Sequence, residues 1–469
     1  MDDTAPLIVV ANRLPVSRTA RGWRASSGGL VTALRPVVER VGGSWIGWDD
    51  DPEGVPARVD DLPCDLYPVP LTDDEVEGYY HGFANRTLWP LFHDLAAQPV
   101  IDRELWEHYE RVNRRFAEQV VQVAAASDRT PVVWVQDYHL MLVPALVRAM
   151  APQLPIGFFL HTPFPPPELI ARLPWRDALL GGVLAADSVG FHISQYRDNF
   201  VRSVQRVFPS MTALGDTLVH PDGRHVRAVA HPISIDATEF AELARSEQTN
   251  RELDELTQQF EGRRVFLGVD RLDYTKGIRH RLQAIQRLLE RRRDLRRDFV
   301  FIQVAVPSRD DVEEYRDLRE QVETEVGRIN GRFTEPGHDV PVHYLYRGIS
   351  RERLAAYYRL ADVMCVTPLK DGMNLVAKEF VTVQAAASGA GVLLLSEFCG
   401  TAFEFGDDAV RCNPFDVDGM SQLMESALEL EEDDRRARIR RLAEIVRRSD
   451  VHRWVADELE SIRDGRSRP

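Results

Sequence analysis

Lysine is almost absent from this sequence. Its 469 residues hold three lysines, Lys276, Lys370 and Lys378, against 55 arginines. Arginine can replace lysine on most surfaces, but not where a phosphate must be met by a compact point charge in a tight space. All three lysines fall inside two loops that contain glycine, so we interpret them as candidate anion-binding positions. Chance survival on the surface is the alternative.

Long apolar runs, paired cysteines and a basic surface are also missing. No stretch of about 18 apolar residues could span a bilayer, and the first residues lack the pattern of a secretory signal. The four cysteines show no metal or redox spacing, which predicts reduced thiols in a cytoplasm. The formal net charge of -15 argues against nucleic-acid and anionic-membrane partners. An anionic ligand must therefore be held by a few local cations.

Short β-branched or aromatic runs alternate with helical periodicity along the chain. The runs predict strands at residues 7–11, 132–135, 156–160, 264–269, 299–304, 342–346, 363–366 and 392–395. Helices are predicted between them, among others at residues 278–291, 310–327 and 351–359. Apolar strands that alternate with amphipathic helices indicate parallel sheets covered on both faces. We therefore predict an α/β fold.

A shift in composition near residues 230–233 predicts two domains. The chain is too long for one ordinary core, and a polar, acidic stretch follows the shift to about residue 263. We expect one α/β domain over residues 1–232 and a second over residues 233–450. A last helix within residues 451–469 is expected to pack back on the first domain.

Two loops that follow predicted strands carry candidate ligand-binding residues, because ligands bind beyond the carboxyl ends of parallel strands. After the strand at 264–269, Arg271 and Lys276 flank a turn that opens a helix. Two cations at that position can meet a pyrophosphate. An ion pair between Arg271 and Asp273 that closes the loop is the alternative interpretation.

The second loop follows the strand at 363–366 and runs through residues 371–379. Gly372 lets the backbone approach a ligand closely, and a helix that begins near Asn374 would direct its first N–H groups at a phosphate. Asp371 and Asn374 can bond sugar hydroxyls, and Glu379 can grip a ribose diol. A capped helix with Asp371 as a turn residue is the plainer alternative.

A complementary set of polar and aromatic side chains lies mostly in the first half. Capping, core packing or ion pairing is the alternative for each of them. The set comprises Arg13 after the first strand, Gly28 and Gly29 before an apolar helix, Tyr80 and Trp89 in a polar-aromatic stretch, Asp137 and His161 at strand ends, and Arg309 after a later strand.

No metal site is predicted. Many sugar transferases hold the donor diphosphate through a divalent ion on an Asp-x-Asp element. The closest runs, residues 49–51 and 416–418, lack the context of a nucleotide loop and are interpreted as solvated acidic loops. Cationic side chains and helix ends are expected to neutralise a diphosphate instead.

Taken together, the motifs resemble the trehalose-6-phosphate synthase family over nearly the full length. The motifs are Asn12-Arg13-Leu14-Pro15-Val16, Gln136-Asp137-Tyr138-His139, His161-Thr162-Pro163-Phe164-Pro165, and residues 271–276 and 371–379. The resemblance implies a GT-B architecture, with two Rossmann-like domains whose parallel sheets face across a cleft. It also implies transfer of glucose from a nucleoside-diphosphate glucose to glucose 6-phosphate, with retention, to give trehalose 6-phosphate.

The resemblance further implies a role for each residue. Arg271, Lys276 and the N–H groups of Leu375 and Val376 would bind the donor diphosphate, and Gly28 and Gly29 would close a loop over it. Glu379 would hold the ribose, while Ile349 lies in the loop expected near the base. Asp371, Gly372, Met373 and Asn374 would contact the transferred glucose, with His161 near its 6-hydroxyl. Asp137 would bind the acceptor sugar, and Arg13, Tyr80, Trp89 and Arg309 its phosphate. We expect His161, Asp137, Arg271, Lys276 and Asp371 to act in catalysis.

The implied mechanism is front-face substitution, in which the departing diphosphate takes the proton of the acceptor hydroxyl. No cofactor is expected beyond the nucleotide sugar, and a separate trehalose-6-phosphate phosphatase would act next in the pathway. Thr275 and Lys370 are slight departures from the family pattern, which weakens Lys370 as a functional residue.

Three other functions stay open at this point. They are a transferase of the same fold with another acceptor, such as glycerol 3-phosphate, a nucleotide-sugar epimerase, and a silent sugar-phosphate sensor. The sequence does not decide whether the donor nucleotide is UDP, GDP or ADP. It also does not decide the oligomeric state, and a homo-oligomer is one of the open alternatives.

Overall fold

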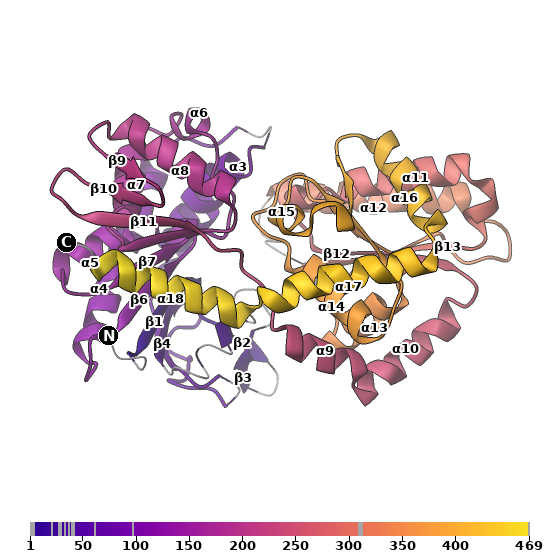
Figure 1. The fold of residues 1–469 in the computed structure, drawn as a ribbon, viewed down its shortest axis with the longest axis horizontal. Helices are drawn as coiled ribbons and strands as arrows, with labels where there is room; N and C mark the ends of the chain where they lie inside the picture. The colour runs from indigo at the N-terminus through magenta and orange to yellow at the C-terminus, as the bar shows by residue number, and fades with distance from the viewer. Residues whose placement is uncertain are drawn as a thin grey trace. The chain divides into compact units, whose positions relative to one another are not determined.

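The chain folds as two compact units, each an α/β structure (Figure 1). The first comprises Met1–Ile233 and Val451–Pro469, and the second comprises Ser234–Asp450. The computed structural model describes residues 5–19, 22–26, 31, 34–35, 38, 43–60, 62–95, 98–307 and 313–467. Both units contain parallel sheets, which confirms the predicted fold class.

A mixed sheet forms the centre of the first unit. Among the described residues it has nine strands, in the order β5-β4-β1-β6-β7-β8-β11-β10-β9. The strands are β1 (Leu7–Arg13), β4 (Gly43–Trp48), β5 (Asp65–Pro68), β6 (Val132–Gln136), β7 (Ile156–Phe159), β8 (Ser188–Phe191), β9 (Thr212–Leu214), β10 (Thr217–Val219) and β11 (His225–Ala230). The first seven strands in this spatial order pair in parallel. The hairpin of β9 and β10 then extends the sheet from β11 with antiparallel pairing.

The chain reverses its direction of travel across this sheet between β1 and β6. It runs from β1 outward to β4 and β5, and then returns to the other side of β1 to lay down β6, β7 and β8. Ligands of open parallel sheets bind at the carboxyl ends of the strands at such a switch point. Arg13 and Asp137, which end or follow these two strands, therefore stand at the position where a ligand is expected.

Helices and a small hairpin complete the first unit. They are β2 (Val16–Thr19), β3 (Gly22–Ala25), α2 (Asp73–Glu75), the π-helical segment η1 (Val76–Leu88), α3 (Trp89–Phe92), α4 (Arg103–Ala125), η2 (Tyr138–Leu140), α5 (Val143–Met150), α6 (Pro167–Ile170), α7 (Arg176–Val183), α8 (Ser194–Val207) and α18 (Val451–Ser467).

The last helix, α18, belongs to the first unit although it is far from it in sequence. It contacts β7, β8 and β11 (Figure 1). Ser461 on α18 lies 3.0 Å from Ser188 on β8, hydroxyl to hydroxyl. A side chain at Gly157 on β7 would overlap Ile462, so the missing side chain lets the helix approach the sheet closely.

The second unit is a six-stranded, fully parallel sheet over the described residues, in the order β14-β13-β12-β15-β16-β17. Its strands are β12 (Arg264–Arg271), β13 (Phe299–Val306), β14 (Val342–Tyr346), β15 (Val363–Val366), β16 (Val392–Ser396) and β17 (Val410–Cys412). The chain reverses between β12 and β15, which is the switch point of the Rossmann strand order. The two loops with the candidate donor-binding residues follow these two strands.

The helices of the second unit are α9 (Ala237–Arg245), α10 (Glu247–Gln259), η3 (Tyr274–Lys276), α11 (Ile278–Arg291), η4 (Arg293–Arg296), α12 (Glu313–Phe333), α13 (Arg351–Leu360), α14 (Leu375–Ala386), α15 (Gly400–Phe405), η5 (Gly406–Asp408), α16 (Val417–Glu429) and α17 (Glu432–Arg448). The predicted helix at 278–291 has the bounds of α11. The first residues of the helix predicted at 310–327 lie outside the described ranges, and α12 begins at Glu313 and extends to Phe333.

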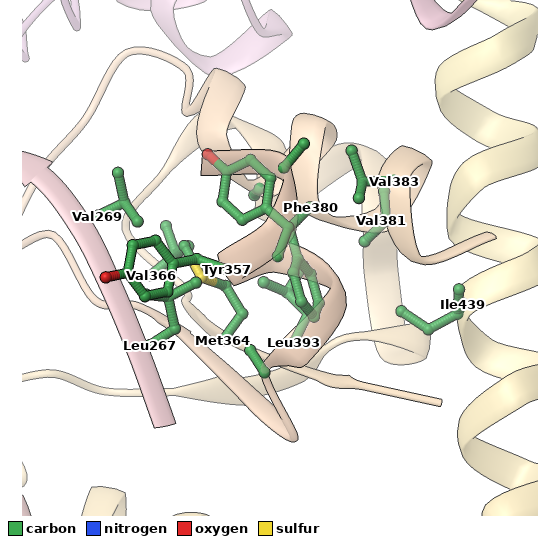
Figure 2. Close-up of a cluster of buried hydrophobic side chains, with 14 of the residues drawn as sticks. Leu267, Val269, Tyr357, Met364, Val366, Phe380, Val381, Val383, Leu393 and Ile439 are labelled. Carbon is green, nitrogen blue, oxygen red and sulfur yellow. The ribbon is translucent and has the colours of Figure 1, made fainter. Parts of the chain in front are cut away.

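Two hydrophobic cores cover the two faces of this sheet. Leu267 and Val269 on β12 point into a core with Met364 of β15, Phe380 of α14 and residues of α13 and α17 (Figure 2). Phe266, which directly precedes Leu267, points into the other core, beneath α11, α12 and α16. A strand buried on both faces reads as a continuous apolar run, which is why the sequence predicted it correctly.

Several strands escaped prediction. Among them, β4 and β8 contain glycine, and β17 is short and carries Arg411, so none forms a run of β-branched or aromatic residues. No helix in the described ranges combines the length and the apolar character that crossing a bilayer requires.

Candidate functional site

The turn that carries Lys276 is built by local hydrogen bonds. Oδ1 of Asp273 accepts from the Thr275 N–H at 2.9 Å, and its Oδ2 accepts from the Tyr315 hydroxyl at 3.0 Å. Gly277 ends the turn in the left-handed conformation, with φ 65° and ψ 23°. A side chain there would overlap the carbonyl oxygen of Thr367. Glycine therefore allows both the turn and its close packing against the loop after β15.

Lys276 and Asp371 meet in this structure although they lie far apart in sequence. Nζ of Lys276 is 2.6 Å from Oδ2 of Asp371, and each side chain is 12% exposed. The two loops are also joined through the backbone, because the Leu369 N–H donates to the Thr275 carbonyl at 2.7 Å. Arg271 stands exposed at the end of β12, beside the same turn.

The N-terminus of α14 lies next to this charged pair. Asn374 caps the helix, because its Oδ1 accepts from the Ala377 N–H at 3.1 Å. Its Nδ2 donates to Oδ2 of Asp371 at 3.2 Å, so the cap is tied to the charged pair. The N–H groups of Leu375 and Val376 lie in the first turn, where the helix dipole favours an anion. The helix is capped, as the plainer alternative predicts, and it also presents an anion-binding end.

Gly372 and Met373 lie where the loop crosses the start of α15. A side chain at Gly400 would overlap the carbonyl oxygen of Gly372. The Thr401 hydroxyl lies 3.1 Å from Sδ of Met373 and 3.0 Å from the N–H of Asn374. These contacts fix the backbone of the loop between Asp371 and the helix.

Glu379 sits one turn into α14 and is held by Tyr358. The tyrosine hydroxyl donates to Oε2 of Glu379 at 2.8 Å. Burial raises the pKa of Glu379, while the hydrogen bond from Tyr358 and the charge of Arg351 act in the opposite direction. Ile349 is partly buried in the loop between β14 and α13, against the same core.

Lys378 has a structural environment. Its side chain is fully buried, and Nζ lies 2.7 Å from Oε2 of Glu404 on α15. A buried ammonium needs such a partner. The buried ion pair accounts for Lys378 and corrects its interpretation as an anion-binding position, whereas Lys276 remains a candidate for that role.

In the first unit, Arg13 lies between an acidic and two aromatic side chains. Its guanidinium carbon is 3.6 Å from the centroid of the Trp48 ring and 5.7 Å from that of Tyr80. Nη1 is 2.9 Å from Oδ2 of Asp50, which is 75% exposed. Trp48 also donates from Nε1 to Oδ1 of Asn12 at 3.0 Å. The sequence analysis missed Trp48, which ends β4 opposite Arg13 in the parallel register.

Tyr80 and Trp89 lie at either end of a run of aromatic contacts. Tyr80 belongs to the π-helical segment η1, a rare conformation that is frequent at functional sites. Its ring stacks on His139 at 5.9 Å between centroids. Trp89 is buried, with its ring 3.9 Å from that of His93 and 5.7 Å from that of Tyr138. The surroundings of Trp89 are those of an aromatic core, as its alternative interpretation predicts.

Asp137 has a strained backbone. Its φ of 72° and ψ of 171° fall in a region that is almost confined to glycine. This conformation brings Oδ1 within 3.1 Å of the His161 N–H, which donates to it. The structure therefore joins these two predicted residues at the carboxyl ends of β6 and β7.

The ring of His161 lies against the side-chain amide of Gln136. Nε2 of His161 is 2.9 Å from Oε1 of Gln136, whose Nε2 donates to the Trp134 carbonyl at 3.3 Å, and this amide orientation assigns the proton of the neutral ring to Nε2. Burial lowers the pKa of His161 to about 3, which keeps the ring neutral. The rings of Phe159 and Trp454 lie 4.8 Å and 6.1 Å from it.

Gly28, Gly29 and Arg309 lie outside the residues that the structure describes. Within the described ranges, no group of three or more His, Cys, Asp or Glu side chains is arranged to hold a metal ion.

The chain is similar to known proteins over nearly its whole length. The model of glycosyltransferase family 20 matches residues 5–464. Trehalose-6-phosphate synthase of Mycobacterium avium is 46% identical over 474 residues, which cover 97% of this chain and 94% of that protein.

Solved structures are similar over the same length. A UDP-forming alpha,alpha-trehalose-phosphate synthase from Burkholderia xenovorans, in complex with glucose-6-phosphate, is 35% identical with a TM-score of 0.88, over 98% of this chain and 100% of that one. An E. coli protein bound with UDP-2-fluoro glucose is 31% identical with a TM-score of 0.88, over 98% of this chain and 99% of that one.

These similarities confirm the resemblance and the GT-B fold inferred from the motifs. The chain belongs to glycosyltransferase family 20.

Proposed function

We propose that this enzyme transfers glucose from a nucleoside-diphosphate glucose to glucose 6-phosphate, with retention, and so forms trehalose 6-phosphate. The observation that carries the proposal is the contact of 2.6 Å between Lys276 and Asp371, beside the N-terminus of α14. The contact brings a cation and a carboxylate together beside a helix end, at the switch point of a Rossmann-like sheet, where a nucleotide is expected.

The second unit would bind the donor. Arg271, Lys276 and the N–H groups of Leu375 and Val376 supply positive charge and hydrogen bonds to the diphosphate. Glu379, oriented by Tyr358, would accept the ribose hydroxyls. Asp371, Gly372, Met373 and Asn374 would contact the glucose, and Ile349 would lie near the base. We favour UDP as the nucleotide of the donor, because one similar protein is UDP-forming and another is bound with UDP-2-fluoro glucose.

The first unit would bind the acceptor. Arg13 lies against Trp48 and Tyr80, and its guanidinium suits a sugar phosphate. By the resemblance, Trp89 and Arg309, a residue of the second unit, would contact the acceptor phosphate, and Gly28 and Gly29 would close a loop over the donor diphosphate. Asp137 and His161, joined by a hydrogen bond, would bind sugar hydroxyls. With its proton on Nε2, the neutral ring of His161 has Nδ1 as an acceptor.

The chemistry would be front-face substitution. The bond between the anomeric carbon and the departing phosphate oxygen breaks, the acceptor hydroxyl attacks from the same face, and its proton passes to the leaving diphosphate. Negative charge grows on that diphosphate, so fixed donors such as Lys276 and the start of α14 lower the barrier. These groups would supply the positive charge without a metal ion. We also propose a cytoplasmic location and a separate phosphatase as the next enzyme.

One assay tests this function. Purified enzyme is incubated with glucose 6-phosphate and UDP-, GDP- or ADP-glucose in turn, with and without EDTA, and the product is identified by mass spectrometry and NMR. We expect trehalose 6-phosphate with at least one donor and an unchanged rate in EDTA. No product with any donor would overturn the function, and inhibition by EDTA would overturn its metal-free part.

Controls separate the alternatives. Glycerol 3-phosphate replaces glucose 6-phosphate in a parallel reaction, and a faster reaction with it would make this a transferase of another acceptor. Turnover of donor without any acceptor would favour an epimerase.

A further inference from the structure

Arg281 on α11 is a fully buried arginine beneath the candidate donor site. Its side chain is 0% exposed and pairs through Nη1 with Oδ2 of Asp270 at 2.7 Å, whose side chain is 2% exposed. Nη1 also donates to Oε1 of Gln303 at 2.7 Å. Burying a guanidinium is costly, and only such a set of partners offsets the cost.

The sheet has a gap that accommodates this guanidinium. Gly268 lies inside β12, where a side chain would overlap Nη1 of Arg281 and lie 2.5 Å from Oε1 of Gln303. Its φ is not in the left-handed region, so the backbone does not require glycine there. The absence of a side chain is therefore explained by the space that Arg281 occupies.

The same guanidinium reaches both loops of the donor site. Nε donates to Oγ1 of Thr367 at 2.9 Å, at the start of the loop that leads to Asp371. Nη2 donates to the carbonyl oxygen of Lys276 at 3.4 Å, in the turn after β12. Arg281 thus connects β12, β13, the loop after β15 and the Lys276 turn.

We propose that Arg281 is a positioning residue for glucosyl transfer. It holds the Lys276 turn against the loop from Thr367 to Asp371, so that the ammonium of Lys276 is fixed where charge develops on the departing diphosphate. This inference rests on the proposed function. Because Asp270 neutralises the guanidinium, Arg281 acts through geometry rather than through its charge.

Arginine suits this position for a reason of shape. Its planar fork donates from three nitrogens in fixed directions, whereas lysine has one nitrogen on a flexible stem. Arg281→Lys keeps a cation for Asp270 but cannot reach Thr367 and the Lys276 carbonyl together. Gly268→Ala leaves every polar group in place and pushes on the guanidinium, so it perturbs the same contacts by another route.

Arg263 provides a matched control at the other end of β12. Its side chain is 11% exposed and donates from Nη2 to the carbonyls of Phe299 and Val340 at 2.6 Å and 3.1 Å. Arg263→Lys therefore removes a comparable set of hydrogen bonds from the same sheet, away from the donor loops.

The test measures kcat, both KM values and the melting temperature of Arg281→Lys, Gly268→Ala and Arg263→Lys. We expect Arg281→Lys and Gly268→Ala to lower kcat by about 10- to 100-fold, as misplacement of a catalytic group by about 1 Å does. Donor KM should change far less, and Arg263→Lys should lose stability without losing kcat. Losses of kcat that only track the loss of stability in all three variants would overturn the proposal.

A double variant tests whether Arg281 acts through Lys276. In the Lys276→Ala background, Arg281→Lys should cause little further loss of kcat, because the group that it positions is gone. Losses that multiply would overturn the proposal.

Hydrogen exchange of the ligand-free protein gives a readout independent of activity. Arg281→Lys should speed exchange in peptides that cover residues 272–278 and 367–374, whereas Arg263→Lys should not. Unchanged exchange in both peptides would overturn the positioning role, even if the wild-type enzyme shows no transfer activity and the proposed function fails. If Arg281→Lys does not fold, Gly268→Ala takes its place in each comparison.

Discussion

Nζ of Lys276 lies 2.6 Å from Oδ2 of Asp371, and this ion pair joins the loop after β12 to the loop after β15. Neither side chain is more than 12% exposed, so solvent screens the pair only in part. An anionic donor that binds beside α14 would share the ammonium with Asp371. Under the proposed function, the geometry of this pair would link donor binding to catalysis.

Replacing Lys276 by alanine should lower kcat by about 100-fold or more, because a fixed donor to developing charge is worth roughly 3–4 kcal/mol in the transition state. Steady-state kinetics with each substrate varied provide the measurement. Lys370→Ala, a change of another lysine in the same pair of loops, is the control and should have little effect. A loss confined to donor KM would contradict a role in the transition state.

Substitutions at Asp137 should affect the stability of the protein and its acceptor affinity differently. Asp137→Gly relieves a backbone conformation that costs a residue with a side chain about 1–3 kcal/mol, whereas Asp137→Ala retains the strain. We expect the glycine variant to unfold at higher denaturant concentration than the alanine variant, while both lose acceptor affinity. Equal stability of the two variants would show that the backbone at residue 137 relaxes.

His161 should remain neutral throughout the range in which the enzyme works. Its pKa is lowered by burial from 6.5 to about 3, so the unfolded chain takes up a proton below pH 6.5 and the folded chain does not. Stability contributed by this residue is therefore present above pH 6.5 and is lost as pH falls toward 3.

Two measurements check this behaviour. NMR of the labelled imidazole at pH 6 should show a neutral ring with its proton on Nε2. The difference in unfolding free energy between wild type and His161→Gln should decrease as pH falls below 6.5. A charged ring at pH 6 would rule out the neutral acceptor role.

Tyr358→Phe should weaken donor binding through Glu379. Loss of the 2.8 Å hydrogen bond costs about 1 kcal/mol, or roughly fivefold in donor affinity by calorimetry, with little change in kcat. Burial already raises the pKa of Glu379, and the Tyr358 hydrogen bond opposes that rise. The variant should therefore lose donor affinity at a higher pH than wild type as pH falls. An identical pH profile would argue against a carboxylate grip on the ribose.

The strands of the second sheet were largely predictable, because burial on both faces produces continuous apolar runs such as residues 264–269. Two strands of the first sheet were not, since β4 and β8 each contain glycine, which interrupts the run of β-branched and aromatic residues. The contact of Trp48 with Arg13 was missed for the same reason. Because β4 was not predicted, the position of Trp48 at its end, opposite Arg13, could not be predicted either.

The lysine count shows both the reach and the limit of a sequence argument. It singled out Lys276, which the structure places against Asp371, and it singled out Lys378 equally, which the structure buries against Glu404. Both environments favour a compact ammonium, so composition does not distinguish a candidate ligand-binding lysine from a lysine in a buried ion pair. The position of each ammonium in the structure makes that distinction.

By itself, the sequence determined the fold class, the family and the two loops that carry the candidate phosphate-binding residues, because strand periodicity and local motifs are properties of neighbouring residues. Only the tertiary structure decided that Lys276 meets Asp371, that Asp137 is strained toward His161, and that Arg281 fills the space beside Gly268. Each of these relations joins residues on different strands or helices. Their geometry depends on packing across the sheet, which no local pattern records.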